Sequence, residues 1–322
     1  MNYIWSILIA VTLFACTKPQ SQSLPTASTL KQQNGERYFT INGIRHWVKI
    51  AGREHNTTPI VIVHGGPGGN NYTFERTAGP KLEEFATVVY YEQRGCGRSE
   101  APQNPTDYAI PTLINDLDIL RDSLGVEKIS LLGYSFGSEL SLRYALAHPT
   151  NVEKLILSAP AELSKANMLV QIQGFYAIGD STVRTGIEKI LQDGTPLPDK
   201  YGKVWNLSSS AMVDRFLFYN PENAQLNRNY WQESKLKNTG LMANVYLQNN
   251  KADLVQKAAG LQTPTLLISG VYDKNGGLHT GLALKEVLPN SHIKLYQKSA
   301  HFPDIEETER FAADVKEFVN SK

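Results

Sequence analysis

The chain has 322 residues, which is enough for one large α/β domain or two small ones. Hydrophobic residues make up 41% of it and charged residues 20%, which is an ordinary globular composition. Lys and Arg number 32 and Asp and Glu 31, so the net charge of +1 gives no electrostatic reason to expect nucleic acid or a highly charged substrate.

The N-terminus resembles a secretion signal. Residues 4–14 are almost wholly apolar, a run too short to span a bilayer as an ordinary helix but suited to the apolar part of a signal peptide. The run ends in Leu13-Phe14-Ala15-Cys16, which resembles a bacterial lipobox, although no Lys or Arg precedes the cysteine. We expect cleavage before Cys16 and its lipidation, which would anchor the protein in the bacterial cell envelope. The alternatives are a plain cleaved signal, which gives a secreted protein, or a short uncleaved anchor.

A flexible tether is predicted to follow the signal. Residues 17–35 carry little apolar content, so they cannot bury enough surface to become ordered. The two cysteines of the chain are Cys16 and Cys96. If Cys16 is lipidated, Cys96 is a lone thiol and no intramolecular disulfide can form.

Strands alternate with helices along much of the remaining chain. Two β-rich runs, 38–41 and 44–50, flank Asn42-Gly43, which is a type I′ turn signal. Further strands are predicted at 60–63, 87–91, 129–132, 155–158, 265–269 and 292–296, and helices at 111–124, 136–147 and 306–319. This alternation predicts an α/β fold with a mostly parallel central sheet and helices on both faces.

The alternation stops after Pro160 and returns at Thr265. Residues 161–259 are helical in pattern, irregular and rich in aromatic side chains, and we expect them to form a helical cap. The core would then comprise residues 36–160 and 260–322. The cap aromatics suit either an apolar pocket or the core of the cap itself.

A nucleophile is predicted at Ser135. Gly133-Tyr134-Ser135-Phe136-Gly137 matches G-x-S-x-G and lies between a predicted strand and a predicted helix. In that setting a sharp turn lifts the serine hydroxyl above the sheet, at the positive end of the helix. The alternative is a structural turn in which Ser135 only caps the helix.

A serine nucleophile needs a base, and the base needs an orienting acid. Asp273 and His301 each follow a predicted strand, so both are expected at the same sheet edge as Ser135. We therefore predict a Ser135–Asp273–His301 triad. Glu162, which follows the strand at 155–158, is the alternative acid, whereas Asp304 is too close to His301 in sequence to be the usual orienter.

The other histidines are weaker candidates for the base. His46, His55, His148 and His292 are expected before strands or at helix ends on the opposite edge, His279 is expected in a helix, and His64 is expected to be structural.

An oxyanion hole is expected in the run His64 to Gly69, which reads His-Gly-Gly-Pro-Gly-Gly after the strand at 60–63. The tetrahedral intermediate of acyl transfer needs two backbone N–H donors, each worth about 3–4 kcal/mol to the transition state. We assign one donor to Gly66 and the other to Phe136, the residue after the nucleophile.

These motifs together resemble the proline iminopeptidase branch of the α/β-hydrolase fold. His64 to Gly69 is similar to that family's H-G-G-P-G-G, and residues 92–99 are similar to its D-Q-R-G-C-G-R-S, with Glu92 in place of Asp. The serine motif is similar to its G-G-S-W-G. The resemblance covers residues 38–160 well and 262–320 moderately. It implies release of an N-terminal residue, often proline, from a short peptide through an acyl-enzyme on Ser135.

In that family, cap carboxylates hold the free α-amine of the substrate. The segment that resembles one such site, residues 243–247, has Ala243 at the acid's place and includes Tyr246, a candidate substrate contact. Glu162, Asp214 or Glu233 could supply the charge instead.

A carboxylic-ester or lactone hydrolase with the same triad is the alternative function, and a non-enzymatic lipoprotein on a hydrolase scaffold is a more distant one. Arg94, Arg98 and Ser99 are expected to brace loops, and Cys96 to be packed rather than catalytic. The sequence contains no H-E-x-x-H motif and no clustered Cys and His, so no metal is expected. A triad mechanism needs no cofactor.

Overall fold

The computed structural model describes residues 32–161, 164–236 and 254–321. Its centre is an 8-stranded sheet with the strand order β1-β2-β4-β3-β5-β6-β7-β8. β1 and β2, and β2 and β4, pair antiparallel, and every other neighbouring pair is parallel. The strands are β1 (Gly35–Ile41), β2 (Ile44–Ala51), β3 (Ile60–Val63), β4 (Val88–Tyr91), β5 (Ile129–Tyr134), β6 (Val152–Ser158), β7 (Thr265–Gly270) and β8 (Ser291–Tyr296).

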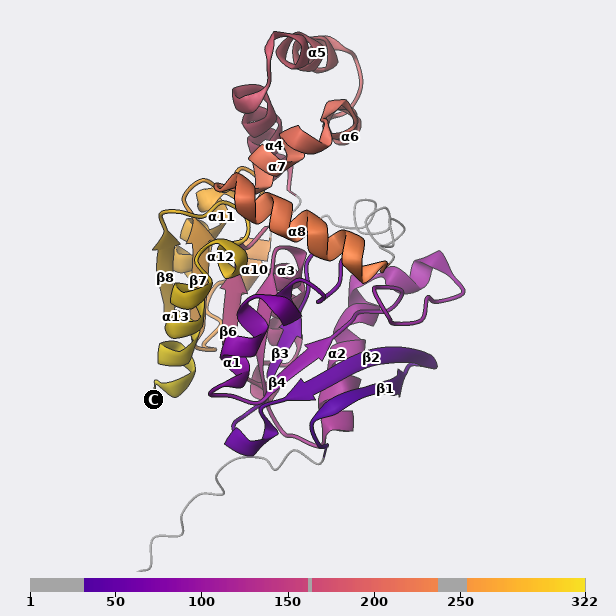
Figure 1. Cartoon of the computed structure of the whole chain (residues 1–322), viewed down its shortest axis with the longest axis vertical. Coiled ribbons are helices and arrows are strands. Elements are labelled where there is room, and N and C mark those ends of the chain that lie inside the picture. Colours follow the sequence, from indigo (N-terminus) through magenta and orange to yellow (C-terminus); the bar gives the residue numbers. More distant parts are fainter. Residues whose placement is uncertain (1–31, 162–163, 237–253, 322) are drawn as a thin grey trace, which may run out of the picture.

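Helices cover both faces of this sheet (Figure 1). α1 and α13 pack together on one face, and α2, α3, α10 and α11 lie on the other. The helices that precede β6, the one just before β7 and those that follow β7 are α1 (Ala78–Glu83), α2 (Ile110–Leu124), α3 (Phe136–Ala147), α10 (Leu254–Ala258), α11 (Gly277–Val287), α12 (Pro303–Glu306) and α13 (Thr308–Asn320), with short 3-10 turns η1 (Arg53–His55), η2 (Phe74–Arg76), η3 (Pro105–Tyr108) and η4 (Pro149–Asn151).

The sequence of β3 is apolar throughout because the strand is covered on both faces. Ile60 and Ile62 pack into the apolar cluster that contains Phe311 of α13, whereas Val61 and Val63 pack into the cluster that contains Leu117 of α2. Successive side chains of a strand point to opposite faces, so a strand covered on both faces needs an uninterrupted apolar run. The mostly parallel α/β sheet predicted from the sequence is confirmed.

Local signals in the sequence act as expected. Asn42 and Gly43 both have positive φ, 48° and 75°, as a type I′ turn requires between β1 and β2. Gly125 ends α2 in the left-handed conformation, with φ of 76°, where its N–H caps the last turn.

The segment between β6 and β7 is helical in its described part. Figure 1 shows α4 (Lys165–Ile178), α5 (Ser181–Gln192), α6 (Leu197–Leu207) and α7 (Ser210–Leu217) beyond one end of the sheet, with α8 (Pro221–Ser234) lying across that end. The first four of these helices share an apolar core, in which Phe175 and Phe216 stack with ring centroids 3.9 Å apart. This arrangement suits a cap, although the domain boundaries stay a prediction.

His46 lies inside β2, where the predicted strand at 44–50 also places it, and not before a strand or at a helix end; it is buried. The predicted signal, the tether up to residue 31 and Cys16 lie outside the described residues. Among the described helices, none has the length and apolar character needed to cross a membrane.

Candidate active site

Ser135 lies in a sharp turn between β5 and α3. Its backbone has φ of 55°, a conformation that a non-glycine residue adopts only under strain of about 1–3 kcal/mol. The turn is held because the N–H of Ser135 donates to the carbonyl oxygen of Ser158 in β6, at 2.9 Å. A side chain at position 137 would not fit, since a Cβ there would lie 1.9 Å from the carbonyl oxygen of Val63.

Three predicted side chains meet at this turn. The Oγ of Ser135 lies 2.9 Å from Nε2 of His301, and Nδ1 of His301 lies 3.0 Å from Oδ2 of Asp273. All three residues are buried. Because Nδ1 faces a carboxylate, it carries the ring proton, and Nε2 is left as the acceptor for the serine hydroxyl.

The surroundings of Asp273 keep it ionised. Its Oδ1 accepts backbone N–H bonds from Asn275 at 2.8 Å and Gly276 at 3.0 Å. Burial pushes the pKa of Asp273 upward, but the charge of His301 and these hydrogen bonds outweigh burial, so the pKa is lowered.

The loop that carries His301 is fastened to the helical segment above it. The N–H of His301 donates to the carbonyl oxygen of Leu217, the last residue of α7, at 2.9 Å. Glu306 adds a second link, because Oε1 accepts from the N–H groups of Tyr219 and Asn220 at 2.7 and 2.8 Å while Oε2 accepts from that of Ala300 at 2.7 Å.

The predicted oxyanion loop packs directly against the serine turn. A Cβ at Gly65 would lie 2.9 Å from Cβ of Ser135, so only glycine permits this approach. Gly66 lines the same cavity as Ser135, and Phe136 follows Ser135 as the first residue of α3. Both residues assigned as N–H donors therefore lie near Ser135, Gly66 in the same cavity lining and Phe136 next to it in the chain.

A cavity of about 310 Å³ opens over Ser135. Its described lining consists of the glycine loop, the serine and histidine, and a largely apolar wall: Gly65, Gly66, Pro67, Gly68, Gly69, Asn70, Thr73, Phe74, Tyr134, Ser135, Trp205, Leu217, Asn227, Trp231, Asn275, His301, Phe302, Asp304 and Ile305. This volume suits a small ligand or the end of a larger one.

The cap aromatics divide between pocket and core. Trp205 and Trp231 line the cavity, whereas Phe175 and Phe216 form the core of the helical segment. Both uses that the sequence allowed are therefore present.

Two carboxylates proposed from the sequence, Asp214 and Glu233, are not among the described residues that line this cavity. Asp214 pairs with Arg228 at 2.7 Å, and the exposed Glu233 accepts from the Tyr72 hydroxyl at 2.7 Å. Glu162, Ala243 and Tyr246 lie outside the described residues.

Sequence reasoning missed Asn275. Its Nδ2 lies 3.0 Å from Nε2 of His301, so the amide donates to the same ring nitrogen as the serine hydroxyl. Asn275 also lines the cavity. An Asn two residues after Asp273 looks like an ordinary turn residue, and no sequence signal marks it.

Asp304 was considered only as an orienting acid and set aside, and its place in the cavity lining was missed. The residue is only 3% exposed, and Oδ1 has no hydrogen-bond partner among the described residues. Burial raises the pKa of Asp304 to about 7, although its own backbone N–H and His301 lower it.

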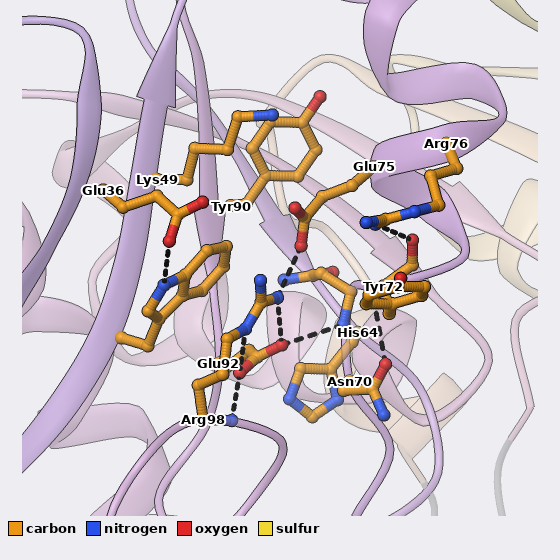
Figure 2. Close-up of polar contacts among 12 residues, drawn as sticks. Glu36, Lys49, His64, Asn70, Tyr72, Glu75, Arg76, Tyr90, Glu92 and Arg98 are labelled. Atoms are coloured by element: carbon orange, nitrogen blue, oxygen red, sulfur yellow. Dashed lines mark hydrogen bonds and ion pairs between the residues drawn. The ribbon is translucent and has the colours of Figure 1, made fainter. Parts of the chain in front are cut away.

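A buried ion cluster lies behind the glycine loop (Figure 2). Arg98 pairs with both Glu92 and Glu75, and its guanidinium stacks on Trp47 at 3.2 Å from the ring centroid. Glu92 also accepts from the backbone N–H of Asn71, beside the loop, at 3.5 Å. The cluster joins β2 and η2 to the turn that follows β4, and through Asn71 it holds the chain just after the glycine loop.

The other residues of the motif at 92–99 that were expected to brace loops also make contacts inside the protein. Arg94 makes a bidentate pair with Asp116, with both distances 2.6 Å. The Ser99 hydroxyl donates to the carbonyl oxygen of Glu92, and the Cys96 thiol is fully buried. These contacts agree with the predicted bracing roles. Among the described residues, no three His, Cys, Asp or Glu side chains gather as a metal ion would require.

The sequence of this chain is similar to those of proteins named proline iminopeptidase. A proline iminopeptidase of Heyndrickxia coagulans is 26% identical over 82% of this chain and 91% of its own. A proline iminopeptidase of Lactobacillus crispatus is 38% identical over 39% of this chain and 43% of its own.

Solved structures show the same fold. A proline iminopeptidase-related protein of Thermus thermophilus superimposes with a TM-score of 0.75 and 22% identity, over 89% of this chain and 98% of its own. An esterase of Exiguobacterium antarcticum gives 0.65 and 22%, over 88% of this chain and 99% of its own.

The sequence also matches a family-wide pattern. The family described as alpha/beta hydrolase fold matches residues 58–308, which include β3 to β8 and all three side chains that meet at the serine turn. This chain belongs to the α/β hydrolase fold family.

Proposed function

We propose that the protein is a serine aminopeptidase that releases an N-terminal proline, or another small apolar residue, from short peptides. The observation that carries the proposal is the hydrogen-bonded series Ser135, His301 and Asp273 at the base of a cavity with a mostly apolar wall. Relatives named proline iminopeptidase, similar over most of the chain, support the choice of substrate.

In this proposal Ser135 is the nucleophile, His301 the base and Asp273 the orienting acid. Oγ of Ser135 attacks the carbonyl carbon of the first residue while Nε2 of His301 takes the hydroxyl proton. The oxygen of the tetrahedral intermediate accepts from the N–H groups of Gly66 and Phe136. His301 then gives its proton to the departing amine, which leaves an acyl-enzyme on Ser135.

The second half of the reaction uses the same groups. A water molecule donates its proton to Nε2 of His301 as it attacks the ester carbonyl, and the proton passes to Oγ of Ser135 as the free amino acid leaves. Asp273 stays ionised throughout and stabilises the imidazolium, consistent with its lowered pKa.

The test compares a prolyl chromogenic amide with its N-acylated twin. We expect the purified protein to cleave the free-amine form, and Ser135→Ala to lose at least about 10⁴-fold in kcat while keeping its circular dichroism spectrum. Retained activity in Ser135→Ala would refute the triad. Turnover of simple esters but of neither amide would favour the ester or lactone hydrolase.

We also propose that the protein is lipid-anchored in the cell envelope, with residues 161–259 as the cap over the site. The support for the anchor is the apolar run that ends in Leu13-Phe14-Ala15-Cys16, followed by a polar tether. Cys16→Ser should move the protein from the membrane fraction to the soluble fraction of the cell envelope. An unchanged distribution would argue against lipidation.

A further inference from the structure

Asn275 lies in the loop between β7 and α11, and its side chain reaches the catalytic histidine. Its Nδ2 lies 3.0 Å from Nε2 of His301, and Oγ of Ser135 lies 2.9 Å from the same nitrogen. A neutral imidazole with its proton on Nδ1 has one acceptor lone pair, at Nε2, which these two donors share. Asn275 therefore contacts the atom that takes and returns the proton, although no step of the proposed mechanism uses it.

The orientation of the Asn275 side chain follows from that of His301. Nδ1 of His301 faces the carboxylate of Asp273 and carries the ring proton, so Nε2 is an acceptor. The carboxamide must then present its N–H group to Nε2, and not its oxygen. Asp273 also fixes the backbone of Asn275, because its Oδ1 accepts from that N–H at 2.8 Å. One carboxylate thus positions both the imidazole and the amide that contacts its other nitrogen.

Asn275 contacts the histidine from the cavity. The residue is half-buried and belongs to the cavity lining. The two other asparagines of that lining have different partners: Oδ1 of Asn70 accepts from a nearby backbone N–H at 2.9 Å, and Oδ1 of Asn227 accepts from the Thr73 hydroxyl at 3.3 Å. Among the described residues of the lining, Asn275 is the one asparagine that is hydrogen-bonded to the catalytic histidine.

Acylation of Ser135 changes the hydrogen bonds available to Nε2. In the acyl-enzyme Oγ is an ester oxygen, so Ser135 no longer donates to the ring. The water that hydrolyses the ester must donate to Nε2 in its place. A water oxygen forms hydrogen bonds at about 2.8 Å. Because Nδ2 of Asn275 and Nε2 of His301 are 3.0 Å apart, one water in the cavity can contact both atoms.

We propose that Asn275 binds the hydrolytic water of the second half-reaction and so acts as a further catalytic residue. This inference rests on the proposed function, because it needs the acyl-enzyme on Ser135. The water accepts a hydrogen bond from Nδ2 of Asn275 through one lone pair and donates to Nε2 of His301. Its second lone pair attacks the ester carbonyl carbon. The new C–O bond forms as the water proton passes to Nε2, and the C–Oγ bond breaks as that proton passes to Oγ.

The same contact matters less in the first half-reaction. There the nucleophile is the hydroxyl of Ser135, which the chain itself holds 2.9 Å from Nε2. A water held by Nε2 alone keeps much of its freedom, whereas a second hydrogen bond from Asn275 fixes its oxygen for attack. Loss of the amide should therefore slow hydrolysis of the acyl-enzyme far more than its formation.

The experiment follows both half-reactions of the full-length protein with p-nitrophenyl acetate. Release of p-nitrophenolate, recorded by stopped flow, gives the rate of acylation, and the fraction of acetylated protein after an acid quench, measured by intact-mass spectrometry, gives the rate of hydrolysis. We expect the acetyl-enzyme to persist roughly 10- to 100-fold longer in Asn275→Leu and in Asn275→Ala, while acylation changes by less than about threefold. Lys274→Arg is the matched control in the same loop. Lys274 is not among the described residues that line the cavity, so both rates should stay unchanged.

Three results would overturn the inference. One is an unchanged lifetime of the acetyl-enzyme in both variants. Another is an equal slowing of acylation and hydrolysis, which would mean that Asn275 only holds His301 in place. The third is a delay in Asn275→Leu alone, which would mean that the leucine blocks the cavity.

Failure of the proposed function would give a different result. No acetylation of the unmodified protein would refute the triad chemistry, and this inference with it. Normal acetylation of Ser135 without cleavage of any prolyl amide would refute the aminopeptidase function alone.

Discussion

Asp273 and Asp304 are both buried carboxyl groups in the active site, but their surroundings move the two pKa values in opposite directions. The pKa of Asp273 is lowered because His301 and two backbone N–H groups outweigh the effect of burial. The pKa of Asp304 is raised to about 7 because the effect of burial exceeds the opposite effects of its own backbone N–H and of His301. Asp273 is thus ionised at neutral pH, whereas Asp304 loses its proton only near neutral pH.

The raised pKa of Asp304 predicts a stability cost at high pH. A folded-state pKa of about 7 against a usual value of 3.8 means that the folded protein binds more protons, so stability falls as pH rises from about 4 to about 7. At pH 8 the cost approaches about 4 kcal/mol. We expect Asp304→Asn to raise the free energy of unfolding at pH 8, measured with urea, and to change it much less at pH 4.5.

Asp116→Asn is the matched control for this effect. Its carboxylate is equally buried but pairs with Arg94, so removal of the charge leaves a cation unpaired and should destabilise the protein by about 3–5 kcal/mol at pH 8. Destabilisation of the Asp304→Asn protein at pH 8 would contradict the raised pKa.

The prediction of site residues succeeded where the place of a residue after a predicted strand was enough to locate it. Asp273 and His301 follow parallel strands, and the ends of parallel strands meet at one edge, so their meeting with Ser135 could be foreseen. Asp304 was judged only as a possible orienter of His301. Its burial and the neighbours that leave Oδ1 unpaired are products of packing, which the sequence pattern does not encode.

At the scale of elements, α12 and the loop before it join the catalytic histidine to the helices above the sheet. Glu306 accepts hydrogen bonds from three backbone N–H groups. Two of them follow α7, and the third precedes His301, so Glu306 links both parts of this joint. A carboxylate offers acceptors on both oxygens, whereas a Gln side chain offers only one.

Glu306→Gln should therefore loosen the joint. The NH₂ group of the Gln side chain would face a backbone N–H, so two donors would meet where a hydrogen bond was lost. We expect this to lower the free energy of unfolding by about 1–3 kcal/mol and to lower kcat roughly tenfold or more. The measurements are urea unfolding and turnover of the prolyl amide.

Glu309→Gln supplies the comparison for that change. Glu309 is an exposed partner of Lys81, so the loss of its charge should alter stability by no more than about 1 kcal/mol and leave kcat unchanged. Equal effects of the two substitutions would mean that the joint does not position His301.

At the scale of the whole molecule, the fold was largely accessible from the sequence. β3 is a short apolar run and α2 has a periodic apolar face closed by Gly125, and both were predicted nearly at their observed bounds. The segment between β6 and β7 was predicted to be a helical cap from its helical pattern and its aromatic side chains, but its individual helices were not placed. Its packing depends on contacts such as that of Phe175 with Phe216, between helices whose pairing has no sequence signature.

Cys96 offers a reporter for the cooperativity of this fold. The thiol is fully buried among residues of the main core, and burial raises its pKa well above the usual value. In a Cys16→Ser protein we expect no alkylation by iodoacetamide in the folded state and complete alkylation in urea, with the same midpoint as circular dichroism. Alkylation well before that midpoint would show that the region around Cys96 opens separately.

The hydrogen bond from the N–H of His301 to the carbonyl oxygen of Leu217 has a consequence for protein engineering. A cap grafted from another hydrolase would bring its own pocket side chains, but it would also have to present a carbonyl oxygen where α7 ends. Without that acceptor, the graft would change the orientation of the imidazole along with the choice of substrate. Cap and histidine loop should therefore be exchanged as one cassette.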